Sequence, residues 1–309
     1  MKEVTLTHSI LDDSAPYEMM LSISSIMYAV HACNDSVRIE FGSNRISPIF
    51  AIPIMAMCDS LRKKGFSLMF NPAALKKNSA MQRFFLDSDI LNNMNPLSGK
   101  TATEAIKKAE AFYPTEASRV LSHRIDLQSL LKLSDTQQHQ QLVREAHNVL
   151  RTISSIVNKN DLTELTCKLI ELFANAIYHS QSNDTVYSSA VELLNGECLV
   201  AVYDQGIGIP GAYNHYRNSY KNKLALRELN DPSAIHWAMQ KGTSTLQCQD
   251  GFSRGVGLSS MKDFIDQYNG MICIASGKGY YSYKNGNEDT RCITIPLKGT
   301  LFMMKLTAA

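Results

Sequence analysis

The stretch "CLVAVYDQGIGIP", Cys198–Pro210, decides how the C-terminal half of the chain is interpreted. Its apolar run is typical of a strand, and that strand ends at Asp204. Gly206 and Gly208 follow, and glycine lets the backbone adopt a positive φ angle or approach a flat ligand closely. A carboxylate at such a strand end can accept a hydrogen bond from an exocyclic amine. Taken alone, the stretch fits an ordinary strand and turn as well as one wall of a ligand site.

Upstream of this strand, residues 161–180 ("DLTELTCKLIELFANAIYHS") have the apolar spacing of a helix. Asp161 is expected to cap that helix, with Glu164 completing a capping box. Glu171 and Asn175 are four residues apart and therefore share one face, opposite the apolar residues. A carboxylate there can deprotonate a water or a hydroxyl, and an amide oxygen can bind Mg²⁺. A solvated helix face is the alternative interpretation.

Downstream, the stretch "GFSRGVGLSSMKDF" places Gly255 and Gly257 at the start of another predicted helix. Backbone N–H groups at a helix start can bind an anion, and glycines let a phosphate come close. The spacing matches neither a P-loop nor a dinucleotide-binding fingerprint. An ordinary glycine-rich loop before a helix is the alternative interpretation here.

Most of the remaining C-terminal segments predict strands. "VELL" precedes the stretch quoted first, and "MICIAS", "GYYSY", "RCITIPL" and "LFMMKL" follow the last helix. A "KNGN" turn suits a hairpin, and Gly299-Thr300 is expected to separate the last two strands. Helices interleaved with hairpin-linked strands predict a largely antiparallel sheet covered by helices.

The order of these features resembles the GHKL ATPase superfamily, which includes gyrase-type topoisomerases, heat-shock chaperones, mismatch-repair MutL proteins and histidine kinases. "ELFANAIYHS" resembles its N box, "DQGIGI" its first glycine box and "RGVGL" its second. "KGTST" resembles the segment before the second glycine box in bacterial members, and "PLKGTLFMMKL" the final hairpin. The resemblance covers roughly Asp161–Leu306. It implies an α/β fold of the α+β two-layer sandwich type, with a Bergerat-type mixed sheet covered by helices over residues 159–309.

The resemblance also implies a ligand, which is ATP held with Mg²⁺ between the helices and the sheet. Asn175 would bind the metal, Asp204 would read the adenine amine, and Glu171 would act as general base. The residues expected to contact the nucleotide are Asn175, Asp204, Gly206, Gly208, Ile209, Lys241, Gly242, Thr243, Ser244, Arg254, Gly255, Val256, Gly257 and Leu258.

Residues 1–100 predict a separate small α/β domain, because strand-like and helix-like segments alternate there. The segment 37–70 is similar to the STAS-type fold of anti-anti-sigma factors. In that family a serine at the helix start can be phosphorylated by a GHKL partner kinase. Ser47 falls at about that place without the usual Asp-Ser-x-Gly context, and a plain helix cap before Pro48 is the other interpretation.

Residues 101–158 are expected to form a helical connector between the two domains. His123 and His147 lie on helix-like stretches of it but lack the neighbours of a phosphoacceptor histidine. Each is therefore expected to be a structural or surface residue. An ordinary membrane sensor kinase is disfavoured for the same reason.

Composition narrows the class of protein further. The 309 residues include 31 basic and 29 acidic ones, for a net charge of +2, so charge gives no clear signal for nucleic-acid binding. The seven cysteines are scattered without a C-x-x-C pair, which favours reduced thiols and a cytoplasmic setting. No signal peptide is visible, and the most apolar run, residues 46–58, is shorter than the roughly 20 residues that span a bilayer.

Two functions remain open from the sequence. The first is a cytoplasmic regulatory ATPase or a serine- or histidine-type protein kinase, with Glu171 as base and another protein as regulatory partner or substrate. The second is a nucleotide-gated protein-binding switch with little or no turnover. The oligomeric state, a homodimer included, stays open as well.

Overall fold

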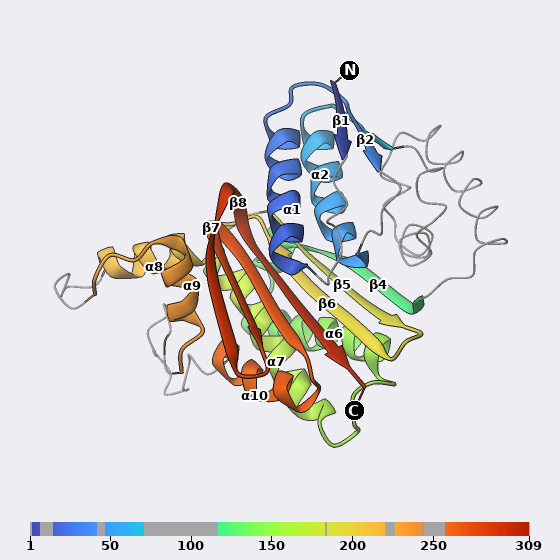
Figure 1. Ribbon diagram of the computed structural model, residues 1–309, viewed down its shortest axis with the longest axis vertical. Coiled ribbons are helices and arrows are strands. Elements are labelled where there is room, and N and C mark those ends of the chain that lie inside the picture. The colour runs from blue at the N-terminus through green and yellow to red at the C-terminus, as the bar shows by residue number, and fades with distance from the viewer. Residues whose placement is uncertain are drawn as a thin grey trace.

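The computed structural model describes residues 2–6, 15–41, 47–70, 117–182, 184–219, 226–241, 243 and 257–308. These residues form a five-stranded sheet with helices on both of its faces and a smaller three-stranded sheet (Figure 1). The expected α+β class is confirmed. No helix in the described ranges is both long and apolar enough to cross a bilayer.

The larger sheet has the strand order β4-β5-β6-β8-β7. Every adjacent pair in it is antiparallel, as the hairpin-linked strands predicted, whereas the family resemblance implied a mixed sheet. Its strands are β4 (Ala117–Asp126), β5 (Thr185–Leu193), β6 (Glu197–Asp204), β7 (Met271–Lys284) and β8 (Asn287–Thr307). The register pairs Asp204, the last residue of β6, with Thr300 on β8. Strand β8 runs without interruption through Gly299, so the expected separation at that point is wrong, and the pairing with β7 shifts register there instead.

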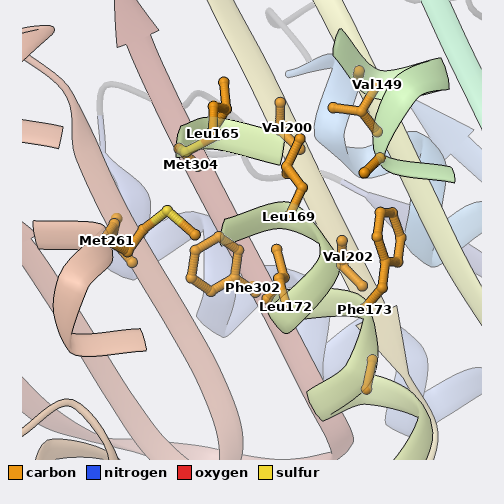
Figure 2. Packing of buried hydrophobic residues seen from close by; sticks show 14 of the residues in the cluster. Val149, Leu165, Leu169, Leu172, Phe173, Val200, Val202, Met261, Phe302 and Met304 are labelled. Atoms are coloured by element: carbon orange, nitrogen blue, oxygen red, sulfur yellow. The ribbon is translucent and has the colours of Figure 1, made fainter. Parts of the chain in front are cut away.

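Three helices cover one face of this sheet: α6 (Asp135–Ile153), α7 (Leu162–Ala174) and α10 (Gly257–Gln267). Helix α7 buries against the sheet the apolar face that the spacing in residues 161–180 predicted (Figure 2). Each fully buried aliphatic or aromatic side chain stabilises this packing by about 1.5–3 kcal/mol. The labelled contacts of α7 with the strands and α10 involve Leu165, Leu169, Leu172, Phe173, Val200, Val202, Met261, Phe302 and Met304.

Helices α1 (Pro16–His31) and α2 (Ala51–Lys63) cover the opposite face, so the N-terminal unit adds a layer to the sheet (Figure 1). Successive residues of β6 alternate between the two faces: Ala201 and Tyr203 pack with the N-terminal helices, and Val200 and Val202 pack under α7. Strands buried on both faces have continuous apolar sequences. This arrangement explains why "CLVAVY" shows no polar alternation.

The smaller sheet consists of β1 (Lys2–Leu6), β2 (Val37–Phe41) and β3 (Leu68–Phe70), paired in parallel in that order. The predicted strand–helix–strand pattern of residues 36–70 is confirmed, with a short 3-10 turn, η1 (Pro48–Phe50), before α2. Ser47 does not cap the helix through its side chain. Its Oγ is buried without a hydrogen-bond partner among the described residues, and its backbone carbonyl accepts from the Phe50 N–H instead. The STAS likeness and modification of Ser47 stay predictions.

The helical connector is wrong for residues 117–126, which form β4. This segment pairs with β5 from Arg119 to Asp126 and again at Ala117 after a register shift, and such a ladder overrides local helix propensity. His123 therefore lies on a strand, with its Nδ1 2.7 Å from Oε2 of the buried Glu145 on α6. Farther along, α6 is a helix as expected and begins with a capping box formed by Ser134 and Gln137. The short helix α5 (Leu127–Leu130) joins β4 to it.

Asp161 precedes α7 as predicted, but its carboxylate does not cap the helix. Its backbone is in the helical region rather than extended, so the side chain does not fold back on the first turn. The carboxylate accepts a 2.6 Å hydrogen bond from the Tyr268 hydroxyl instead. Glu164 forms an ion pair with Lys168, at 3.0 Å, in place of the capping box.

Candidate functional site

Helix α7 continues directly into one turn of π-helix, η4 (Asn175–His179). Glu171 is exposed and Asn175 is half-buried, on the side away from buried Leu172 and Phe173. The Asn175 N–H donates to the carbonyls of Glu171 and Leu172, at the last position before the π turn. Single π turns inside helices occur frequently at functional sites because they re-aim the side chains that follow. The pair expected to share a polar face does so.

The Glu171 carboxyl has its pKa raised above the usual value. The main cause is partial desolvation of the side chain, and the positive charge of Lys168 opposes it. A raised pKa makes a carboxylate a stronger base, which suits proton abstraction near neutral pH. Lys168 itself is buried and donates to the Ser260 carbonyl on α10 at 2.7 Å, so it ties α7 to α10.

The glycine loop after β6 rests on the end of the π turn. The Ile207 N–H donates to the Ser180 carbonyl at 2.8 Å. A Cβ at Gly206 would lie 2.1 Å from the same oxygen, so only glycine allows this approach. The contact brings two segments that are distant in the sequence, the Glu171–Asn175 helix and the loop after Asp204, against each other.

Asp204 is only 4% exposed at the end of β6. Burial raises the pKa of its carboxyl to about 7, and hydrogen bonds from Gly206 and Thr300 act in the opposite direction. The Gly206 N–H donates to Oδ1 at 2.9 Å, and Thr300 also hydrogen-bonds to this carboxyl. A buried carboxylate of this kind is stabilised when a further N–H donor reaches it.

Gly208 begins helix α8 (Gly208–Ser219) with a φ angle of +71°. A Cβ there would lie 2.6 Å from the Ser276 hydroxyl, so glycine is required sterically as well as conformationally. Gly299 is held equally closely, since its Cβ would meet the Asp204 carbonyl at 1.9 Å. Ser276, Gly299 and Thr300 thus border the site although the sequence did not single them out as ligand-binding residues. The only signal was the glycine at 299, which was interpreted as a strand break.

The structure also describes two residues of the "KGTST" segment, Lys241 and Thr243. Helix α9 (Asp231–Ala238) precedes Lys241, which is exposed. The Thr243 hydroxyl donates to the carbonyls of Trp237 and Gln240, at 2.8 Å each, and so closes the end of that helix. These contacts place the hydroxyl in a local turn rather than in the group around Asp204.

Gly257 is the first residue of α10, and Leu258 packs against the apolar cluster under α7. Ile209 packs against the same cluster, while its N–H donates to the Ser276 hydroxyl at 2.9 Å. Five of the predicted contact residues lie outside the described residues: Gly242, Ser244, Arg254, Gly255 and Val256.

A magnesium ion needs oxygen ligands. Within the described ranges no group of three or more His, Cys, Asp or Glu side chains is placed to hold a metal. Mg²⁺ in nucleotide sites takes only one or two protein ligands and completes its shell with phosphates and water. The half-buried Asn175 amide fits a single-ligand role of this kind.

No protein-family model matches the chain, and no curated protein matches it either.

Proposed function

We propose that this chain is a Mg-ATP-binding protein of the GHKL type that acts as a regulatory ATPase or protein kinase. The observation that carries the proposal is the contact between the loop after buried Asp204 and the end of the Glu171–Asn175 helix. The Ile207–Ser180 hydrogen bond and the missing Cβ at Gly206 make that contact. This contact joins the helix that carries the Glu171 carboxylate and the Asn175 amide to the loop that follows the Asp204 carboxylate.

Asp204 supports recognition of a base with an exocyclic amine. Its carboxyl is buried, and its hydrogen bonds come from neutral donors, Gly206 and Thr300. An amine N–H from a ligand would stabilise the ionised form, whereas a keto oxygen would face the carboxylate with a second acceptor. Adenine therefore fits this position better than a 6-keto purine.

Glu171 and Asn175 have different roles, in proton abstraction and in metal binding. Glu171 accepts the proton of a water or of a protein hydroxyl, and partial desolvation of its side chain strengthens it as a base. Asn175 contributes an amide oxygen to Mg²⁺, which neutralises phosphate charge when bound. Positioning and electrostatics supply most of the rate enhancement in phosphoryl transfer, so few protein groups are needed.

The nucleotide-gated switch remains a second candidate, and one observation favours it. Tyr203, next to Asp204, stacks on Tyr187 with ring centroids 6.2 Å apart. The Tyr187 hydroxyl donates to Asp59 on α2 at 2.9 Å, and Arg124 Nε donates to the same carboxylate oxygen at 3.1 Å. The strand that carries the base-reading residue is therefore in contact with the N-terminal layer. A change at the nucleotide could reach a partner surface along this path.

The localisation proposed with this function is cytoplasmic. The cysteines that the structure describes are free thiols, four of them buried. Reduced cysteines are the rule in the cytosol. The protein partner would be a regulatory partner or a substrate.

Calorimetry with Mg-ATP and a phosphate-release assay test the proposal. We expect wild type to bind Mg-ATP, Glu171→Ala to bind it without turnover, and Asn175→Ala to lose both. Glu164→Ala is the matched control, because this half-exposed carboxylate lies on the same helix two turns away. Absence of Mg-ATP binding by wild type would overturn the assignment. Mass spectrometry after incubation with ATP and a cell lysate separates hydrolysis from transfer to a protein, Ser47 included.

A further inference from the structure

Ser276 is a fully buried serine on β7, at the point where the pairing of β7 with β8 shifts register. A serine at a fully buried sheet position needs partners for its hydroxyl. Three groups from two other elements surround it. All three contacts are polar: a backbone N–H, a backbone carbonyl and a hydroxyl.

The Ser276 hydroxyl joins the glycine loop to β8. Its Oγ accepts from the Ile209 N–H at 2.9 Å and donates to the Gly299 carbonyl at 2.9 Å. Its Oγ also lies 3.1 Å from the Thr300 hydroxyl. Thr300 in turn hydrogen-bonds to the Asp204 carboxyl. The chain of contacts therefore runs from the start of α8, through Ser276, to the side chain that reads the base.

The number of available protons decides which group donates in each of these hydrogen bonds. A hydroxyl has one proton and two lone pairs. Ser276 donates its proton to Gly299 and accepts from Ile209, so the Thr300 hydroxyl donates to the remaining lone pair of Ser276. The backbone N–H of Thr300 is then the donor that reaches the Asp204 carboxyl. A side chain without a hydroxyl leaves both a backbone N–H and a backbone C=O without this partner. The crowding by Gly208, whose Cβ would lie 2.6 Å from Oγ, shows that little space is left for a larger group.

Resting on the proposed function, we infer that Ser276 is a positioning residue for base recognition. Its hydroxyl fixes the loop through Ile209 and fixes Thr300, and Thr300 orients the Asp204 carboxyl. Loss of the hydroxyl lets Thr300 and the loop relax, so the carboxyl no longer meets an exocyclic amine in one geometry. Loss of the Ser276 hydroxyl therefore weakens the preference for a 6-amino purine over a 6-keto purine. Contacts to the phosphates lie elsewhere on the nucleotide and are not affected.

The test compares the affinities for Mg-ATP and Mg-ITP, which differ at position 6 of the base. We expect wild type to prefer ATP, and Ser276→Ala to lower the ratio of the two dissociation constants about tenfold, the effect of one net hydrogen bond. Ser188→Ala is the matched control. It removes another buried strand hydroxyl, one without a partner among the described residues, and should leave the ratio unchanged.

Each remaining outcome decides the inference. An equal loss of ATP and ITP affinity in Ser276→Ala means that the serine is only structural, and the inference fails. If that variant does not fold, Thr300→Val removes the other hydroxyl of the Ser276–Thr300 contact at nearly the same side-chain volume and should show the same reduced ratio. Equal binding of both nucleotides by wild type overturns the inference but leaves nucleotide binding intact. Binding of neither nucleotide overturns the proposed function itself.

Discussion

Asp204→Asn is the substitution whose effect can be worked out furthest from the structure. Asparagine has nearly the same shape and keeps an oxygen that accepts from the Gly206 N–H, but it has no charge to bury. Burial raises the pKa of the Asp204 carboxyl from 3.8 to about 7. Between these two pH values the native state keeps a proton that the unfolded chain has released. Unfolding then releases protons, so the stability of wild type falls as pH rises through this window.

The magnitude follows from the width of the window. At about 1.4 kcal/mol per pH unit, the span from 3.8 to about 7 amounts to about 4 kcal/mol, as an order-of-magnitude figure. Above pH 7 the full cost is present and the contribution becomes constant. The variant lacks this term, so it should gain up to about 4 kcal/mol relative to wild type between pH 4 and pH 8.

Urea unfolding at pH 4, 6 and 8 measures this difference, with circular dichroism and the fluorescence of Trp237, the single tryptophan, as probes. Titration of other groups contributes to both proteins and cancels in the comparison. Asp135→Asn, at the exposed start of α6, is the control for removing a charge without burial. A difference between Asp204→Asn and wild type that stays the same from pH 4 to pH 8 would refute the reasoning.

Two further substitutions test the contacts around the site. Gly206→Ala should lower Mg-ATP affinity by tenfold or more and cost about 1–3 kcal/mol of stability, because the new Cβ would lie 2.1 Å from a backbone oxygen; Gly286→Ala, with open space around it, should leave the affinity unchanged in calorimetry. Tyr187→Phe should cost about 1–2 kcal/mol in urea unfolding, because buried Asp59 loses a donor. The same change at exposed Tyr28 should cost nothing measurable, and equal effects at both tyrosines would contradict the role of the Asp59 contact.

The local periodicity of the sequence was enough to predict several elements. The apolar spacing in residues 161–180 predicts which face of α7 is buried, and the structure buries that face. The same holds for the strand that ends at Asp204 and for the shared face of Glu171 and Asn175. Gly206 and Gly208 were expected to allow a positive φ angle or a close approach, and a Cβ at either position would clash with a neighbouring group.

Only the tertiary structure decided how these elements pair. Residues 117–126 have no local mark of an edge strand, since their strand state depends on the ladder with β5. Asp161 has the sequence of a cap, but the Tyr268 hydroxyl takes its carboxylate. Thr300 lies next to Asp204 and Ser276 lies next to Thr300 because three neighbouring strands align there, a proximity that no spacing along the chain encodes. Local sequence thus determined which residues are candidates for the proposed chemistry. Long-range pairing determined which groups contact them, because hydrogen bonds between distant strands exist only once the sheet has formed.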